Sequence, residues 1–360
     1  MPCHECPTHG DRPVMHRRSA KLLALTCVLL GLVLALPAGA FAASGWHVQK
    51  SGTKADLIGV DFVNSTHGWA VGYIADTSTG AILATTNGGA TWKAQKSGTA
   101  EQLNKVAFVN AKDGWAVGDG GTILATTNGG STWKAQKSGA SADTVLAGVA
   151  FVNAKDGWAV GSKSGGVILA TTNGGATWKA QNAHTSANLI SVAFVNTKDG
   201  WAVGLPGTIL HTTNGGTTWK AQKSGTMGLL DGVAFTDATH GWVSGFGIIL
   251  ATKNGGATWK TQYSSNVAPF TGVAFANAKH GWVVGRGGLI FATTNGGTTW
   301  KAQKSGVGAD LSGVSFANAK DGWAVGASGT ILHTSGGGGL ATGKLTLTLS
   351  GLTGGALKLG

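Results

Sequence analysis

The sequence predicts an all-β fold, a seven-bladed β-propeller whose last blade is completed by the N-terminal strand. A Gly-Trp pair recurs at intervals of 40 to 46 residues, which defines seven repeats. Each full repeat contains four short strand patterns separated by glycine-rich turns. The strand missing from the seventh repeat is found ahead of the first one. A fixed period of this length with four strands per unit is typical of propeller blades.

Each repeat begins with two apolar positions that alternate along a strand, as in Val60 and Phe62, preceded by Leu57. Residues two apart lie on one face of a strand, so this pattern predicts a strand with one buried face. A turn such as "NAKDG" follows, in which Asn and Asp-Gly tolerate the backbone of a tight hairpin. "WAVG" and "ILATT" then predict two further strands, and "NGG" turns the chain into the last strand, "TWKAQ".

The 14 tryptophans divide into two classes of seven. The Gly-Trp class comprises Trp69, Trp115, Trp158, Trp201, Trp242, Trp282 and Trp323. The class ahead of the last strand comprises Trp92, Trp133, Trp178, Trp219, Trp259 and Trp300, and Trp46 in "SGWHVQKSG" supplies its seventh member. We therefore expect residues 45–335 to form the ring, with each indole packed between blades and its N–H satisfied locally.

A lysine follows each tryptophan of the second class in the six full repeats, on what is expected to be the outermost strand of the blade. These residues are Lys93, Lys134, Lys179, Lys220, Lys260 and Lys301. They predict a basic rim, which discourages pairing between edge strands of different molecules. The formal net charge of +12 favours anionic partners in general.

Residues 1–42 have the features of a secretory signal peptide. "HRRSAK" is basic, "LLALTCVLLGLVLAL" is apolar, and "PAGAFA" predicts cleavage between Ala42 and Ala43. Met15 is an alternative start, and a retained N-terminal anchor is the alternative to cleavage. All three cysteines lie in this segment, and "CHEC" has no second pair, so we expect neither disulfides nor a metal site. A secreted or extracytoplasmic location argues against nucleic acid as a partner.

The C-terminal end differs from the repeats. Residues 336–343 are expected to be a glycine-rich linker, and residues 344–360 include "KLTLTLS", whose alternation predicts a strand. This tail is too short to bury a core by itself. It is either the start of a truncated β-sandwich module or an edge strand added to the propeller.

The turn motif T-x-N-x-G-x-T-W resembles the Asp-box of bacterial neuraminidase repeats, with Asn in place of Asp; an example contains Thr126, Asn128 and Trp133. The longer pattern "GWAVGDGGTILATTNGGSTW" resembles the repeat of photosystem II stability/assembly factor propellers, over residues 45–335. The resemblance implies a non-catalytic, exported or lumenal protein that holds a membrane-protein assembly intermediate. Photosynthetic members use an arginine-rich patch for binding, whereas Arg286 is the only arginine here after the signal segment.

The sequence offers few residues that could support an enzymatic function. A sialidase requires an arginine cluster and a tyrosine nucleophile, and one arginine cannot form that cluster. A glycoside hydrolase requires two carboxylates at a suitable separation, but four aspartates occupy the same "KDG" turn in different repeats, as expected of structural residues; they are Asp113, Asp156, Asp199 and Asp321. We therefore expect no catalytic residue and no cofactor.

Loops that differ between repeats are the candidate binding elements. Tyr73 and Asp76 lie in the longer loop "YIADTSTGA", Lys163 lies in "SKSGGV", and Arg286 lies in "GRGGL". Neutral variation of exposed turns is the alternative. The leading hypothesis is a monomeric, exported scaffold that binds a protein or a membrane-protein complex. A propeller that binds cell-wall carbohydrate or another anionic envelope polymer is the alternative, and a glycoside hydrolase is the third. Partner identity, the binding face and whether the host is photosynthetic stay open.

Overall fold

A computed structural model describes residues 45–339, without the side chains of residues 266–268. The predicted signal peptide, the predicted C-terminal strand and residues 340–343 of the predicted linker lie outside the described residues. The described chain is all-β apart from three short 3-10 turns, η1 (Ala75–Thr77), η2 (Arg286–Gly288) and η3 (Ala327–Gly329). Within residues 45–339 we find no helix with the length and apolar character needed to span a membrane.

Most repeats form one four-stranded antiparallel sheet, as predicted. The first repeat forms β2 (Asp56–Phe62), β3 (Gly68–Ile74), β4 (Thr79–Thr85) and β5 (Lys93–Gln95). The second forms β6 (Leu103–Phe108), β7 (Gly114–Gly118), β8 (Ile123–Thr126) and β9 (Lys134–Ala135). The third forms β10 (Val145–Phe151), β11 (Gly157–Ser162), β12 (Gly166–Thr171) and β13 (Lys179–Gln181). The fourth forms β14 (Asn188–Phe194), β15 (Gly200–Leu205), β16 (Thr208–Thr212) and β17 (Lys220–Gln222).

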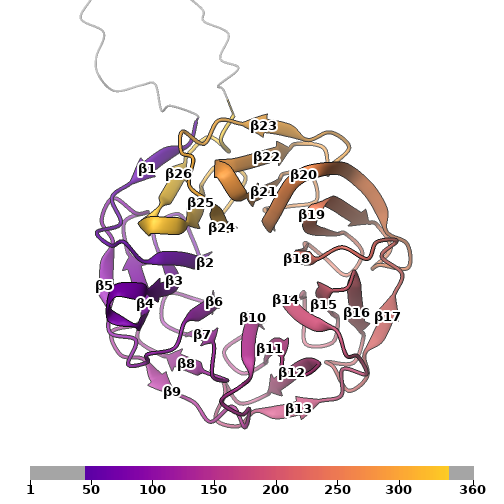
Figure 1. The fold of residues 1–360 in the computed structure, drawn as a ribbon, viewed down its shortest axis with the longest axis horizontal. Coiled ribbons are helices and arrows are strands. Elements are labelled where there is room, and N and C mark those ends of the chain that lie inside the picture. The colour runs from indigo at the N-terminus through magenta and orange to yellow at the C-terminus, as the bar shows by residue number, and fades with distance from the viewer. Residues whose placement is uncertain (1–44, 340–360) are drawn as a thin grey trace, which may run out of the picture. The chain divides into compact units, whose positions relative to one another are not determined.

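The seventh repeat recruits a strand from the other end of the described chain. β24 (Leu311–Phe316), β25 (Gly322–Gly326) and β26 (Ile331–Thr334) are joined by β1 (His47–Gln49), which pairs antiparallel with β26. His47 lies opposite His333 and Gln49 opposite Ile331. In Figure 1 the sheets follow one another around a centre, with the first strand of each repeat innermost and the last outermost. β24 packs against β2, so the seventh repeat contacts the first.

The fifth and sixth repeats differ from the expected four strands each, because they share one six-stranded sheet. It contains β18 (Leu230–Phe235), β19 (Gly241–Thr252), β20 (Lys260–Phe275), β21 (Gly281–Gly285), β22 (Leu289–Thr293) and β23 (Lys301–Gln303). β19 includes the second and third strands of the fifth repeat, with Gly247 at φ 69° between them. β20 pairs with β19 between Lys260 and Ser264 and again at Pro269, and it pairs with β21 from Phe270 to Phe275.

A missing glycine explains why β20 is continuous. In most repeats the last strand is followed by a glycine with positive φ, such as Gly98 at 73° after β5 or Gly225 at 81° after β17, which turns the chain toward the next repeat. In the third repeat His184 takes this conformation, with φ 47°. The fifth repeat has Ser265 at the same place, and its φ is not positive, so the backbone stays extended into the next repeat.

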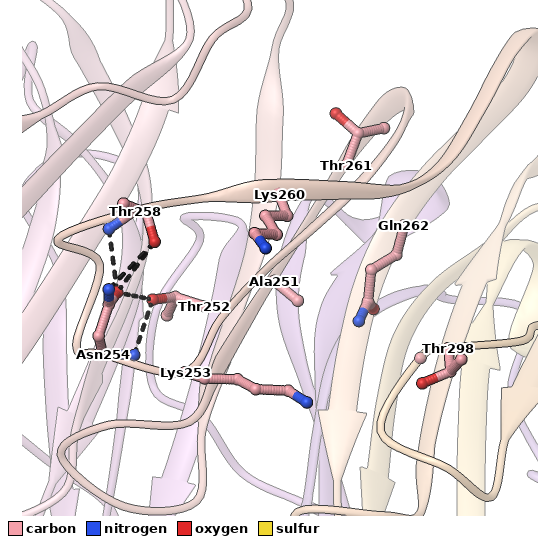
Figure 2. A pocket seen from close by; sticks show the side chains of 10 residues that line it. Ala251, Thr252, Lys253, Asn254, Thr258, Lys260, Thr261, Gln262 and Thr298 are labelled. Carbon is pink, nitrogen blue, oxygen red and sulfur yellow. Dashed lines mark hydrogen bonds between the residues drawn. The ribbon is translucent and has the colours of Figure 1, made fainter.

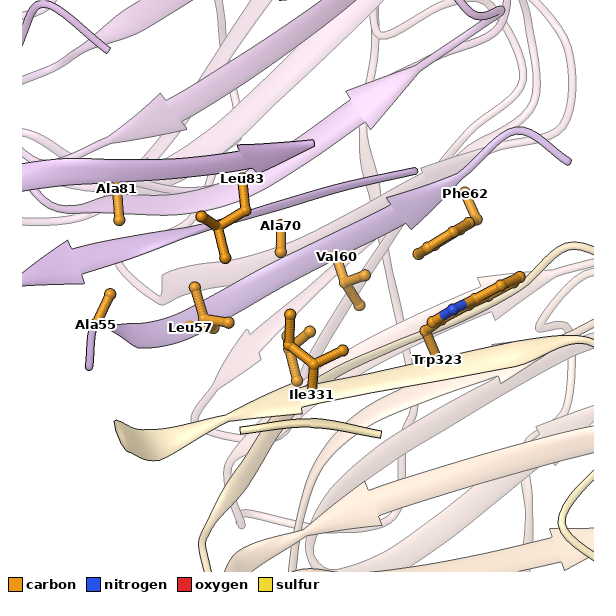
Figure 3. Packing of buried hydrophobic residues seen from close by; sticks show 10 residues of the cluster. Ala55, Leu57, Val60, Phe62, Ala70, Ala81, Leu83, Trp323 and Ile331 are labelled. Atoms are coloured by element: carbon orange, nitrogen blue, oxygen red, sulfur yellow. The ribbon is translucent and has the colours of Figure 1, made fainter. Parts of the chain in front are cut away.

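The core consists of apolar layers between neighbouring sheets. Figure 3 shows the layer between the first and seventh repeats, where Leu57, Val60 and Phe62 face Trp323 and Ile331. The Phe62 ring stacks on Trp323 with 3.5 Å between centroids and meets Trp92 edge-on. The same stack recurs between the other neighbouring repeats, in the pairs Trp69–Phe108, Trp115–Phe151, Trp158–Phe194, Trp201–Phe235, Trp242–Phe275 and Trp282–Phe316. Such aromatic pairs stabilise by roughly 0.5–1.5 kcal/mol beyond the area they bury.

The indole N–H groups donate to neighbouring repeats rather than to local acceptors. Trp323 Nε1 donates to the Gly88 carbonyl at 3.1 Å, and Gln49 Nε2 donates to the same carbonyl at 2.8 Å. Gln49 Oε1 in turn accepts from Trp92 Nε1. We call this set of three hydrogen bonds the Gln bridge. It recurs between successive repeats around Gln95, Gln136, Gln181, Gln222, Gln262 and Gln303.

Candidate partner-binding face

The four predicted binding residues occupy the same connection in their repeats, between the second and third strands. Tyr73 lies near the end of β3 and Asp76 in η1, Lys163 lies between β11 and β12, and Arg286 begins η2. These connections lie next to those that join consecutive repeats: Gly287 N donates to Asp310 Oδ1, and Ser328 N to Asp56 Oδ1. We call the surface made by both kinds of connection the loop face. Because they come from repeats one, three and six, the four residues form no single cluster.

Two of the four residues, Tyr73 and Lys163, are poorly available to a partner: Tyr73 is partly covered, and Lys163 already has an ion-pair partner. Tyr73 is half-buried, whereas Asp76 is exposed. Lys163 Nζ lies 3.1 Å from Asp143 Oδ1 and 2.6 Å from Ser141 Oγ. The hydrogen bonds from Ser141 and Lys163 hold the pKa of Asp143 below its usual value. Lys163 is thus engaged by its own repeat.

Arg286 is exposed and makes no close contact with a carboxylate of the described chain. Within residues 45–339 no carboxylate lies within salt-bridge range of Arg286. Asp231 in β18 interacts electrostatically with Arg286 over a longer distance. Burial raises the pKa of Asp231 to about 6, and the positive charge of Arg286 opposes that rise. Gly287 has φ 66°, which only glycine adopts readily, and its N–H is held by Asp310, so the loop that carries Arg286 is fixed.

Sequence reasoning missed a position on the loop face that varies from repeat to repeat. The residue after the "WAVG" strand is Tyr73, Asp119, Ser162, Leu205, Phe246, Arg286 or Ala327 in the successive repeats. Leu205 is 41 % exposed and Phe246 is 58 % exposed. The differences stand out once the repeats are aligned position by position, whereas a search by loop length passes over Leu205 and Phe246.

The inner strands hold a half-buried pair of opposite charges, Asp61 and Lys105, which the sequence alone did not identify. Asp61 in β2 accepts from Phe108 N at 2.7 Å, and Lys105 in β6 faces it. Burial raises the pKa of Asp61 to about 6, although Phe108 and Lys105 oppose the rise. Burial likewise lowers the pKa of Lys105. In most repeats alanine stands at the position of Asp61, so this pair is specific to the first two repeats.

A pocket of about 540 Å³ lies between the fifth and sixth repeats, near the turn after the third strand. Figure 2 shows Lys253 extending from this turn toward Thr298. The turn satisfies its own hydrogen bonds, since Asn254 Oδ1 accepts from Thr252 Oγ1 and from Thr258 N. None of the lining residues is acidic, so the pocket lacks the carboxylates a glycosidase needs. No group of His, Cys, Asp and Glu able to hold a metal ion occurs in the described part of the chain.

Radially arranged antiparallel sheets with variable loops at one face define a repeat protein of the β-propeller class. The chain belongs to the family described as photosynthesis system II assembly factor YCF48, whose model matches residues 38–141, 135–227 and 264–351. No curated protein matches the chain.

Solved structures share the fold at low identity. One described as YCF48 bound to D1 peptide is 22 % identical, with a TM-score of 0.65 over 80 % of this chain and 96 % of its own. YCF48 from Cyanidioschyzon merolae is 24 % identical, with a TM-score of 0.64 over 81 % and 98 %. The GH74 xyloglucanase from Xanthomonas campestris is 12 % identical, with a TM-score of 0.64 over 82 % of this chain and 54 % of its own.

Proposed function

We propose that this chain is an exported, non-catalytic, seven-bladed propeller, closed by its N-terminal strand, that holds a protein partner during assembly of a membrane-protein complex. The match to the YCF48 assembly-factor family over more than half of the chain carries this proposal. A relative described as bound to D1 peptide supports a protein as the partner. The pairing of β1 with β26, and the contact of β24 with β2, support a closed ring.

The aspartates of the repeat turns favour a non-catalytic role. Asp113 Oδ2 accepts from Asn110 Nδ2, and the same bond recurs at Asp156, Asp199 and Asp321. These carboxylates hold their own turns. A pair of free carboxylates facing a common cleft would favour the glycoside hydrolase that the xyloglucanase likeness leaves as an alternative.

Capture from the envelope of the native host tests the proposal. The tagged full chain is cross-linked in the envelope, and retained proteins and glycans are identified by mass spectrometry. We expect a specific membrane-protein partner that is lost when Tyr73 and Arg286 on the loop face are replaced by alanine. The rim variant Lys134→Ala serves as the control and should retain the partner. Recovery of envelope polymer alone would overturn the proposal.

The basic rim favours a second candidate, an anionic envelope polymer. The six rim lysines are exposed and lie on the outermost strands, in β5, β9, β13, β17, β20 and β23. Attraction between exposed charges is screened over roughly 10 Å at 0.1 M salt. Binding to purified wall polymer at this rim should therefore disappear at moderate salt and should not depend on the loop face. The same lysines blunt the outer edges, which supports a monomer.

A further inference from the structure

Exposed large hydrophobic side chains are concentrated on one part of the loop face. Five occur among residues 45–339: Val48, Val145, Leu205, Met227 and Phe246. Val48 lies on the outermost strand β1, and the other four belong to loops or strand ends of the third to fifth repeats. Met227 is 76 % exposed, the most of the five. Such a concentration marks an interaction surface more often than chance exposure does.

Backbone hydrogen bonds hold the loops of Leu205, Met227 and Phe246 against one another. Gly207 N donates to Gly228 O at 2.8 Å, which joins the Leu205 loop to the Met227 loop. Phe246 N donates to Leu229 O at 3.0 Å, which joins the Met227 loop to the tip of β19. A groove of about 380 Å³ lies beside Met227, between Pro206 and Lys223. The three loops that carry these exposed apolar side chains are thus held side by side, and the groove borders the Met227 loop.

In the sixth repeat a cationic side chain, Arg286, takes the place of the apolar residue. Leu205, Phe246 and Arg286 occupy the same repeat position in the fourth, fifth and sixth repeats. All three are exposed, and Arg286 has no salt bridge within the described residues. Successive repeats therefore present an apolar, an apolar and a cationic side chain in order along the loop face.

We propose that Leu205, Met227, Phe246 and Arg286 form the docking surface for an extended protein segment with two apolar side chains followed by a carboxylate. The proposal rests on the proposed function of partner binding and adds the chemistry of the segment. Burial of the apolar side chains supplies affinity. The planar guanidinium binds a carboxylate with two parallel hydrogen bonds, which fixes the direction of the segment. An extended segment suits the surface because its contacts are spread over the fourth, fifth and sixth repeats.

Selection from a displayed library of random 12-residue peptides tests this inference on the immobilised full chain. We expect enriched peptides with two apolar residues followed by Asp or Glu. One enriched peptide, made synthetically, should bind Phe246→Ser at least ten-fold more weakly and Phe246→Leu within about two-fold. On Arg286→Gln the preference for the acidic residue should disappear while the apolar preference stays.

Val48→Ser is the matched control, because it removes an exposed apolar side chain outside the loop face, and thermal unfolding verifies that every variant is folded. No enrichment, enrichment without this pattern, or equal binding to Phe246→Ser would overturn the inference. Binding of neutral phosphatidylcholine vesicles in place of peptides, lost in Phe246→Ser, would also overturn it. If envelope partners are captured equally by wild type and Phe246→Ser, the inference fails and the proposed function stands. If no protein partner is captured at all, the proposed function itself fails.

Discussion

The side chain of Gln49 has a hydrogen-bond partner at each end, and both belong to the first repeat, whereas Gln49 itself belongs to β1. Its Nε2 reaches the Gly88 carbonyl and its Oε1 accepts from Trp92. The repeated "KAQ" glutamine therefore joins sheets and is not a surface residue of the rim. An amide has both a donor and an acceptor, so no other side chain of this length satisfies both partners.

Gln181→Ala should destabilise the protein by about 1–3 kcal/mol. The substitution leaves the buried Trp219 indole without its acceptor, while the Gly215 carbonyl keeps its bond from Trp158. Urea unfolding followed by tryptophan fluorescence measures the change. Lys220→Ala, an exposed neighbour on β17, serves as the control and should change the free energy of unfolding by less than about 0.5 kcal/mol. Equal unfolding midpoints for both variants would contradict this role of Gln181.

Asp61 should make the protein more stable at low pH, within the window in which it titrates. Its pKa is raised from 3.8 in the unfolded chain to about 6 in the folded protein, so the folded state binds the proton more tightly. The free energy of unfolding should therefore fall as the pH rises from about 4 to 6, by up to about 3 kcal/mol. Asp61→Asn keeps an acceptor for Phe108 N and should remove this slope. A slope unchanged in the variant, measured by urea unfolding between pH 4 and 7, would refute the assignment.

At the scale of the strand and turn, the pattern of glycines decides where each element ends. The all-β fold and the four-stranded antiparallel sheets were predictable because alternating apolar positions and Asn-Gly turns recur with little change. The six-stranded sheet was not predicted, because Ser265 replaces a turn glycine while the neighbouring pattern stays the same. Sequence alone does not tell whether a non-glycine residue adopts positive φ, as His184 does, or stays extended, as in the fifth repeat.

Gly98→Ala should destabilise the protein by about 1 kcal/mol. Gly98 has φ 73°, and an added Cβ would meet no atom within 4 Å, so the cost comes from the backbone conformation alone. Gly308→Ala is the matched control, since that glycine also has open space around it but no positive φ. The control should be neutral or slightly stabilising, because alanine restricts the unfolded chain. Similar losses for both glycines in urea unfolding would argue against a turn held by φ.

At the scale of the whole molecule, the loop face brings together residues that lie far apart in the sequence. Arg286, Tyr73, Asp76 and Lys163 were chosen because their loops differ in length or composition. Leu205 and Phe246 were not, because a comparison of loop lengths passes over single apolar residues at strand ends, and their exposure is known only from the structure. The half-buried pair of Asp61 and Lys105 could not be predicted from the sequence, because the two residues belong to different repeats and meet only in the folded protein.

Removal of β1 tests the ring as a whole. A chain that begins at residue 51 lacks Trp46 and Gln49, so β26 loses its paired strand and Trp92 loses its acceptor. Compared with a chain that begins at residue 44, its melting temperature should fall by roughly 5 °C or more, since about 3 kcal/mol corresponds to such a shift in a domain of this size. A synthetic peptide of residues 44–52 should restore part of this loss in proportion to its concentration, because it binds the folded state. The same peptide with Trp46 and Gln49 replaced by alanine should restore none. If both chains melt at the same temperature, β1 is a dispensable edge strand, and the proposed closure of the ring is wrong.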